Sequence, residues 1–321
     1  MGSVRLISEA EVERLLPMRL ALQPVEEAFR WHGEGRVENR SRVRLRGEGG
    51  LLHVMPASLL PANAMGLKAY TTFRGRANFI ALLWSAETGE LRAIVEADRL
   101  GQIRTGAASG VATKYLARLD ADVVGCYGTG YQAETQLEAI SLVREIRRIQ
   151  VFSRDAERRA RFAATMSQRL GVEVVAMDRP EAVARGASIL VTITNSKTPV
   201  LRGAWIEPGA HVNAAGSNAL DRVELDAEAV LKAALVVADS KAQAEIECGD
   251  LMGPMKDGKL RWGSVSELGE IVAGKSSGRR SRDEITLFES QGVAMEDVAV
   301  CATLLRRAEA EGVGELRSIG E

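Results

Sequence analysis

Hydrophobic and polar residues form two different patterns along this chain of 321 residues. Between residues 40 and 97, short β-prone runs such as NFIALLWS and ELRAIVEA are separated by glycine, proline and asparagine, which is typical of a mostly antiparallel sheet. Between residues 121 and 290, short apolar runs alternate with helical patterns, and further strands are predicted at 172–177, 188–194, 211–216, 234–239 and 284–289. This alternation predicts an α/β fold with a doubly wound parallel sheet.

Helical patterns flank these two regions. Residues 1–36 are predicted to be helical, with a capping box at Ser8–Glu11, and a second helix is predicted at residues 98–118. A last helix spans Gly292 to Glu311, and its apolar face needs a surface to cover it. We therefore expect an α+β domain made of residues 1–118 with 297–321, and a parallel-sheet domain made of residues 119–296.

The stretch Ala121–Arg154 has the form strand, glycine turn, helix, strand, and its turn fits G-x-G-x-x-A from Gly128 to Ala133. In a nucleotide-binding unit the first glycine permits the tight turn, and the second lets the backbone approach a pyrophosphate. A turn that binds nothing also needs glycine, but the complete unit favours dinucleotide binding. The residues expected at the cofactor are Gly128, Thr129, Gly130, Tyr131 and Gln132.

The second strand of this unit ends in Ser153-Arg154-Asp155. A hydroxyl followed by an arginine suits the 2′-phosphate of NADP(H), whereas an acidic residue accepts the 2′-hydroxyl of NAD(H). Ser153 and Arg154 therefore favour NADP(H) over NAD(H), and Asp155, one position further on, keeps NAD(H) open. The alternative is that Ser153 caps the next helix and Arg154 is solvated.

Composition argues against several other classes of protein. The formal net charge is −1, without long blocks of like charge, so neither a nucleic-acid nor a membrane partner is expected. The three cysteines and three histidines are scattered, so no metal site is expected. The chain has neither an apolar stretch of membrane-spanning length nor the pattern of a signal peptide. We expect a cytoplasmic protein.

Several segments together resemble the ornithine cyclodeaminase/mu-crystallin family over nearly the whole chain. In chain order they are Leu52–Ala57, Gly66–Lys68, Ala86–Glu90, Arg104–Ala108, Gly128–Ala133, Pro208–Asn213, Glu224–Asp226 and Leu268–Glu270. The resemblance implies a dimerising α+β domain built from both chain ends and a Rossmann domain between them. It also implies hydride transfer between C4 of a nicotinamide and the α-carbon of an imino or amino acid.

The resemblance implies that Arg42 clamps the substrate carboxylate, and a planar guanidinium suits that task. Strand alternation places Arg40, Arg42 and Arg44 on one face. Arg44 is the alternative clamp if the register differs. Without the resemblance, the three arginines would form a solvated face of an edge strand.

Two further cations are implied at the substrate. Lys68 lies in a mostly apolar strand, and the family's matching lysine contacts the carboxylate or the reacting centre. Burial can lower the pKa of a lysine, so Lys68 could relay a proton to the imine nitrogen. Arg104 is expected to help hold the carboxylate, and Thr105 to face the cofactor phosphates. The alternatives are a snorkelling lysine and a helix-surface arginine.

Polar residues also follow the later strands. Thr192 and Thr194, with Asn195 beside them, come after a predicted strand, and strand carboxyl ends line the cofactor crevice. They could flank the nicotinamide, although Asn195 also suits a plain turn. Asn218 stands where cyclodeaminases carry the aspartate that serves as acid and base, and an amide cannot exchange that proton. Asp221, three residues on, is the alternative base.

We therefore expect an NAD(P)H-dependent reductase of a small imino acid, or the reverse amino-acid dehydrogenase. The first alternative is an ornithine cyclodeaminase-type lyase, which Asn218 puts in doubt. The second is a non-catalytic, mu-crystallin-like protein that binds a nucleotide. The β-rich segments between residues 40 and 97 are too few to close a barrel, and their edges need cover, so a homodimer is expected.

Overall fold

The computed structural model describes residues 3–318 and divides the chain into two compact units. One unit contains the residues up to Arg104 and those from Val293 onward, and the other runs from Thr105 to Gly292. The sequence places these boundaries after residues 118 and 296, whereas the first division falls inside helix α3 (Asp98–Leu116). The functions assigned to the two units stay predictions.

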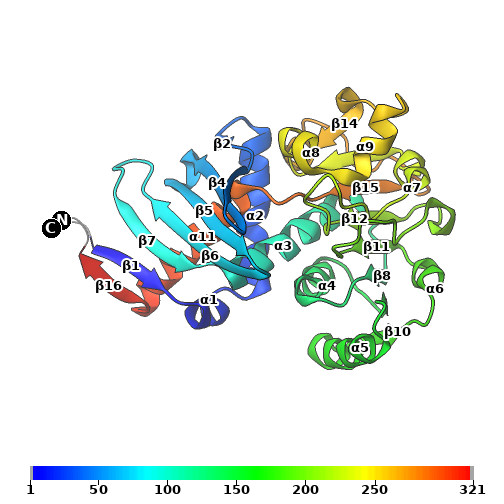
Figure 1. Ribbon diagram of the computed structural model, residues 1–321, viewed down its shortest axis with the longest axis horizontal. Helices are drawn as coiled ribbons and strands as arrows, with labels where there is room; N and C mark the ends of the chain where they lie inside the picture. The colour runs from blue at the N-terminus through cyan, green and yellow to red at the C-terminus, as the bar shows by residue number, and fades with distance from the viewer. Residues whose placement is uncertain (1–2, 319–321) are drawn as a thin grey trace. The chain divides into compact units, whose positions relative to one another are not determined.

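The first unit is built on a sheet with the strand order β16-β1-β7-β6-β5-β4-β2, and β3 pairs with β4 (Figure 1). Its strands are β1 (Ser3–Ile7), β2 (Val37–Asn39), β3 (Val43–Gly47), β4 (Gly50–Leu59), β5 (Ala64–Phe73), β6 (Arg76–Trp84), β7 (Leu91–Glu96) and β16 (Glu315–Ser318). Its remaining elements are α1 (Glu9–Leu15), α2 (Met18–Gly33), η1 (Leu60–Ala62) and α11 (Ala294–Glu311). Strands β4 to β7 are antiparallel, as the sequence predicts.

The prediction for the N-terminal segment is wrong at one element, because Ser3–Ile7 forms a strand rather than a helix. Its backbone pairs with β7 and β16, and Val4 and Ile7 are buried. Both partner strands come from distant parts of the chain, so local periodicity could not reveal the pairing. The capping box that starts α1 is confirmed, since the Ser8 N–H donates to the Glu11 carboxylate at 2.8 Å.

Helix α11 covers one face of the first sheet and packs against β4, β5 and α2. Met55, Ala57 and Leu59 alternate toward the buried side of β4, and α11 itself buries twelve residues. The terminal helix therefore finds cover for its apolar face on strands from early in the chain, as its pattern requires.

The second unit is a parallel sheet in the order β10-β9-β8-β11-β12-β15-β13-β14. Its strands are β8 (Val123–Tyr127), β9 (Arg148–Phe152), β10 (Glu173–Ala176), β11 (Ile189–Thr192), β12 (His211–Ala214), β13 (Leu235–Ala238), β14 (Val265–Glu267) and β15 (Thr286–Glu289). Its helices are α4 (Tyr131–Val143), α5 (Ala156–Leu170), α6 (Pro180–Ala184), α7 (Ala227–Lys232), α8 (Lys241–Glu247), α9 (Gly249–Lys256) and α10 (Leu268–Val272), with η2 (Gly203–Trp205) and η3 (Trp262–Ser264). The strand order reverses between β8 and β11, where such sheets bind their ligands.

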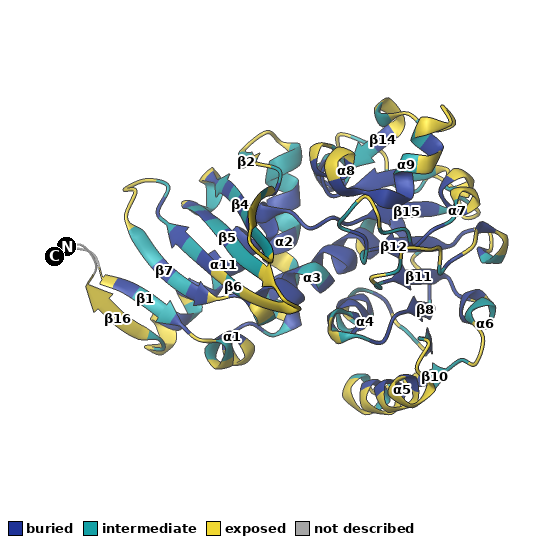
Figure 2. Cartoon of the chain, viewed as in Figure 1, coloured by how far each residue is buried: buried dark blue, intermediate teal, exposed yellow. Residues whose placement is uncertain are grey.

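The doubly wound parallel sheet is confirmed, and each strand predicted after residue 170 contains an observed one. Two strands in this part of the chain were missed, the three-residue β14 of this sheet and β16 of the first unit. Both faces of the sheet are covered: Val124 and Cys126 of β8 join one hydrophobic cluster, while Val123 and Tyr127 join another. Such two-sided burial produces continuous apolar strands rather than alternating ones. Figure 2 shows β11, β12 and β15 as buried and the edge strand β16 as exposed.

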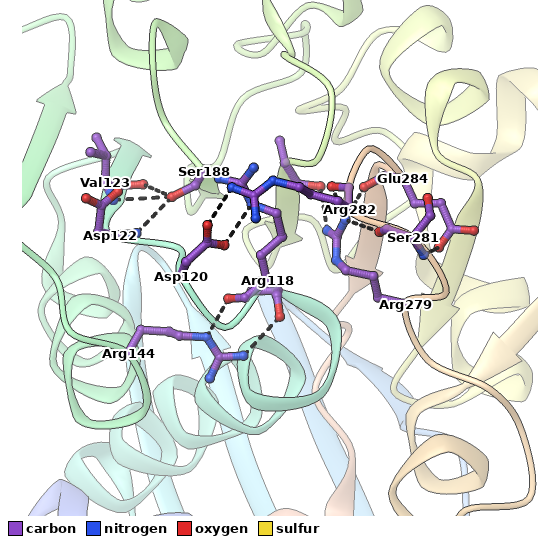
Figure 3. Close-up of polar contacts among 12 residues, drawn as sticks. Arg118, Asp120, Asp122, Val123, Arg144, Ser188, Arg279, Ser281, Arg282 and Glu284 are labelled. Atoms are coloured by element: carbon purple, nitrogen blue, oxygen red, sulfur yellow. Dashed lines mark hydrogen bonds and ion pairs between the residues drawn. The ribbon is translucent and has the colours of Figure 1, made fainter.

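A polar network holds the amino-terminal edge of the parallel sheet (Figure 3). Arg144 donates from Nε to the Arg118 carbonyl at 2.8 Å, and Arg282 pairs with Asp120 at 2.6 Å. The Ser188 hydroxyl accepts from the N–H groups that begin β8. These contacts lie where the strands start, whereas ligands of such sheets bind at the carboxyl ends. We therefore assign this network a role in stabilising the fold rather than in binding a ligand.

Among residues 3–318, none of the helices is both long and apolar enough to span a membrane.

Candidate active site

The turn between β8 and α4 has the form that the sequence predicts. Gly128 has φ +118°, and a Cβ there would meet the Ile193 carbonyl oxygen at 2.4 Å. Packing within the protein therefore already requires glycine at position 128. Gly130 is the N-cap of α4, and a Cβ added there would meet nothing nearer than Arg158 Nη2 at 3.7 Å. Protein packing alone does not explain the second glycine, but the close approach of a ligand does.

The end of β9 carries the residues that the sequence assigns to the ribose. The Thr129 hydroxyl donates to Ser153 Oγ at 2.7 Å, which joins the glycine turn to this strand end. Asp155 caps α5 by accepting from the Arg158 N–H at 2.9 Å. Ser153 is therefore not the cap. Arg154 is exposed, and sequence reasoning missed Arg158, whose guanidinium lies near Gly130; the arginine-rich start of α5 was the available signal.

The ends of β11 and β12 are joined by a buried carboxylate, Glu224, to which the sequence analysis assigns no role. Glu224 Oε1 accepts from the Thr194 N–H at 2.6 Å and from the Thr194 hydroxyl at 2.7 Å. Its Oε2 accepts from the Gly216 N–H at 2.8 Å. Burial raises the pKa of Glu224 to about 7. Thr192, the last residue of β11, is buried, and Asn195 is exposed.

Asn218 and Asp221 lie in the loop after β12. Asn218 Oδ1 accepts from Arg222 Nη1 at 3.0 Å, so the amide has a defined orientation. Asp221 is exposed and pairs with Lys197 at 2.6 Å. This hydrogen bond lowers the pKa of Asp221, which makes its carboxylate a weaker base than an ordinary aspartate.

The first unit holds a buried group of cations and carboxylates. Lys68 on β5 is 2% exposed, and its Nζ donates to Asp297 Oδ1 at 2.8 Å. Arg104 donates from Nε to the same oxygen at 2.9 Å and from Nη1 to Glu296 Oε2 at 2.8 Å. Helix α3 comes close to the lysine at Gly101, where a Cβ would lie 3.7 Å from Nζ.

Burial and then the charge of Arg104 lower the pKa of Lys68 to about 8, while Asp297 acts in the opposite direction. Burial also opposes the charge of Arg104, but Asp297 and Glu296 outweigh it and hold the pKa of Arg104 above its ordinary value. Sequence reasoning missed both carboxylates. The signal was an acidic pair in the first turn of a helix whose next two turns are mostly apolar.

Arg42 is buried, 6% exposed, and close enough for its charge to lower the pKa of Lys68. The alternation expected for Arg40, Arg42 and Arg44 is wrong, because β3 begins only at Val43. Arg40 is exposed and pairs with Glu38, whereas Arg44 is half-buried. Of these three arginines, only Arg42, in the loop before β3, is buried.

His53 is a further residue of this region that the sequence did not assign. It stacks on Tyr70 with ring centroids 4.2 Å apart, and its Nε2 lies 3.1 Å from the Thr72 hydroxyl. Burial, followed by the charges of Arg44 and Arg42, lowers the pKa of His53 to about 4. The imidazole of His53 is therefore neutral at physiological pH and adds no charge beside Arg42 and Arg44.

At the junction of α3 with the parallel sheet, Thr105 is half-buried, and its carbonyl accepts from Gln136 Nε2 at 3.2 Å. A Cβ on Gly106 would meet the Thr135 carbonyl oxygen of α4 at 2.4 Å. The small residue at position 106 therefore allows close packing of α3 against α4. A cofactor contact of Thr105 stays a prediction.

Known proteins resemble this chain over nearly its full length. A delta(1)-pyrroline-2-carboxylate reductase of Bacillus cereus is 38% identical over 283 residues, which cover 86% of this chain and 87% of the relative. The structure of Thermococcus litoralis delta(1)-pyrroline-2-carboxylate reductase in complex with NADH and L-proline matches with a TM-score of 0.92 and 36% identity, covering 97% of this chain and 99% of that one.

An archaeal alanine dehydrogenase dimer with bound NAD matches with a TM-score of 0.93 and 34% identity, covering 99% of this chain and 100% of that one. The family model of the ornithine cyclodeaminase/mu-crystallin family matches residues 4–312. This match includes the glycine turn, the buried Arg42, Lys68 and Arg104 of the first unit, and both carboxylates of α11. The chain therefore belongs to the ornithine cyclodeaminase/mu-crystallin family.

Proposed function

We propose that this chain is a nicotinamide-dependent reductase of a small imino acid, and in the reverse direction an amino-acid dehydrogenase. The observation that carries this proposal is the buried group of Lys68, Arg104 and Asp297, in which a lysine with a pKa of about 8 lies beside a permanent cation. Relatives that reduce pyrroline-2-carboxylate or oxidise alanine support the same chemistry.

The substrate side of the proposal rests on Arg42 and Arg104. Both guanidinium groups are buried and held near Lys68, and a planar guanidinium can donate two parallel hydrogen bonds to a carboxylate. Glu296 and Asp297 fix the guanidinium of Arg104 through two different nitrogens. A clamp that is held before the substrate arrives loses less conformational entropy on binding.

Lys68 is proposed as the proton donor in imine reduction. With a pKa of about 8, its side chain is mostly an ammonium at pH 7 yet can release its proton readily. Asp297 orients Nζ through a 2.8 Å hydrogen bond. The proton goes to the imine nitrogen, and the resulting amine leaves as an amino acid.

The cofactor side rests on the glycine turn. The residues there fit a dinucleotide, because Gly130 leaves space in front of the first N–H groups of α4 and Arg158 adds a cation beside that space. Gly128, Thr129, Gly130, Tyr131 and Gln132 would hold the pyrophosphate, and Thr105, Thr192 and Thr194 would contact the rest of the molecule. When bound, the reduced nicotinamide supplies a hydride to the α-carbon of the imine.

We place NADP(H) ahead of NAD(H) for this chain. Ser153, Arg154 and Arg158 suit a 2′-phosphate, and the Asp155 carboxylate is engaged as the cap of α5. The two structural relatives described above carry NADH and NAD. The preference therefore rests on the residues at the end of β9 alone.

We also propose a homodimer formed through the outer face of the first sheet. Val43, Leu45 and Ile80 are 51%, 54% and 40% exposed, and strand register places Val43 and Ile80 in one cross-strand row. An exposed apolar face on a sheet marks an association surface, and the archaeal alanine dehydrogenase is a dimer. Sedimentation should give a dimer for the wild type and a monomer for Leu45→Glu combined with Ile80→Glu.

The proposed reaction is tested by following NADPH and NADH absorbance with cyclic ketimines, and with 2-oxo acids plus ammonia or methylamine. Reductase turnover with at least one imine is expected. Ornithine with NAD⁺ is the counter-assay, because Asn218 has no acid or base to offer the cyclisation. Multiple-turnover proline formation from ornithine, with no imine reduced, would overturn the proposal in favour of a cyclodeaminase.

A further inference from the structure

Glu224 has no role in the reaction proposed above, yet its carboxylate sits between two strand ends. It is 0% exposed. Oε1 accepts twice from Thr194, which follows β11, and Oε2 accepts from Gly216, which follows β12. These strands are parallel neighbours. The two oxygens therefore tie together two segments at the carboxyl edge of the sheet.

At Gly216 the two segments approach so closely that position 216 has no room for a side chain. A Cβ on Gly216 would meet the Thr194 nitrogen at 2.4 Å and Glu224 Oε1 at 2.6 Å. Both oxygens of Glu224 receive a backbone N–H, so only a carboxylate satisfies the donors on both sides. A glutamine amide would direct its own N–H₂ group at one of these backbone donors.

The backbone of Glu224 is fixed in turn by α9. Asp250 Oδ1 accepts from the Glu224 N–H at 2.6 Å and from the Leu225 N–H at 2.8 Å. The titratable groups that act on Glu224, or on which it acts, are Asp250 on α9, Glu289 at the end of β15 and Cys126 on β8. Glu224 is thus anchored on its own side before it joins the two strand ends.

In doubly wound sheets the strand beyond the first βα unit holds the adenosine ribose, and the strands on the other side of the switch point face the second half of the dinucleotide. Here the first set is β9, and the second is β11 with β12. We propose that Glu224 is a positioning residue for the nicotinamide half of the cofactor, an inference that rests on the proposed function. Its carboxylate sets the separation of the Thr194 and Gly216 segments, while the Gly128–Ala133 turn holds the adenosine diphosphate half.

The test compares Glu224→Gln with Asp226→Asn. Asp226 is the matched control, because its Oδ1 accepts from the Gly203 and Ala229 N–H groups at 2.9 Å and 2.8 Å, but these belong to η2 and α7 rather than to the ends of β11 and β12. At about pH 8.5, above the pKa of about 7 of Glu224, the carboxylate is charged. Calorimetry at that pH measures the Kd of NADH, NADPH and ADP-ribose for each full-length variant. ADP-ribose keeps the second ribose but lacks the nicotinamide ring, so it reports the binding of every part of the cofactor except that ring.

Glu224→Gln should weaken NADH and NADPH by about tenfold or more, as expected for loss of hydrogen bonds to a charged acceptor, and leave ADP-ribose within about twofold. Asp226→Asn should lower the melting temperature and leave all three Kd values within about twofold. Equal weakening of cofactor and ADP-ribose by Glu224→Gln would mean general loosening and would overturn the proposal, as would no weakening at all.

Glu224→Asp covers the case in which the amide variant does not fold. It keeps the charge but is one methylene shorter, so it should reach one strand end and weaken the cofactors less than Glu224→Gln while again sparing ADP-ribose. A Kd for NADH equal to that of wild type would contradict the proposal. The proposed reaction fails separately, if wild type binds cofactor but reduces no imine. A wild type that binds neither cofactor would overturn both.

Discussion

The two units bury charge in opposite ways. The first buries Arg42, Lys68 and Arg104 and pairs the last two directly with carboxylates of α11. The second buries Glu224 and Asp250, which accept from backbone N–H groups. In the first unit, the side chains of Lys68 and Arg104 form ion pairs with carboxylate side chains. In the second unit, the carboxylates of Glu224 and Asp250 accept hydrogen bonds from backbone N–H groups.

This difference separates side chains that can bind a ligand directly from carboxylates that fix the position of the backbone. An ion pair between side chains can rearrange when a further carboxylate arrives, because guanidinium and ammonium groups each have several donors. A carboxylate that accepts from backbone N–H groups has fixed partners, and a change there moves the chain itself. Substitutions in the ion pairs of Lys68 and Arg104 should therefore act on the substrate, and substitution of Glu224 on the cofactor.

The largest effect is expected for Arg42→Ala. Loss of a buried cation that binds a carboxylate costs on the order of 2–5 kcal/mol, so kcat/KM for the imino acid should fall by about 30- to 5,000-fold. Arg40→Ala is the control, since its side chain is exposed and paired with Glu38, and it should stay within about twofold. Equal losses in both variants would break the comparison.

Asp297→Asn should change the pH dependence of the reaction. The pKa of Lys68 is about 8, so its ammonium is lost as the pH rises through that value, and kcat/KM for imine reduction should fall above pH 8. Asp297 raises the pKa of Lys68, so its loss should move this fall to lower pH by on the order of one unit. Glu296→Gln touches Arg104 instead and should leave the inflection in place. An unchanged profile in Asp297→Asn would remove Lys68 as the acid.

Arg154→Ala should separate the two cofactors. We expect the Kd of NADPH to rise about tenfold, and that of NADH by less than about threefold, because only NADPH has the 2′-phosphate. Arg161→Ala, an exposed arginine of α5 that pairs with Glu157, is the control. The same loss for both cofactors would remove the assignment of NADP(H) to this strand end.

The smallest effect is expected for Asn218→Ala. Its amide accepts from Arg222 and has no proton to exchange at ordinary pH, so kcat for imine reduction should fall by less than about tenfold. Steady-state kinetics compares kcat for imine reduction in Asn218→Ala and in Arg42→Ala. A loss as large as that of Arg42→Ala would place Asn218 in the chemical step.

Much of the second unit was open to prediction because its signals are local. Strands buried on both faces produce short apolar runs in the sequence. The glycine that the turn requires, Gly128, directly follows β8, so strand and turn are recognised together. The strand Ser3–Ile7 was missed for the opposite reason, since both of its partners lie far away in the chain.

The sequence by itself determined which residue types could bind a carboxylate and a dinucleotide: Arg42, Lys68, Arg104 and the glycine turn. Only the tertiary structure decided how these groups are held. Lys68 meets Asp297 across 229 positions of the chain, and Arg104 meets it across 193. Hydrophobic periodicity reports which side of an element is buried, but not which distant element lies against it. The partners of buried charges, Asp297 and Glu224 among them, therefore emerge only when the chain is folded.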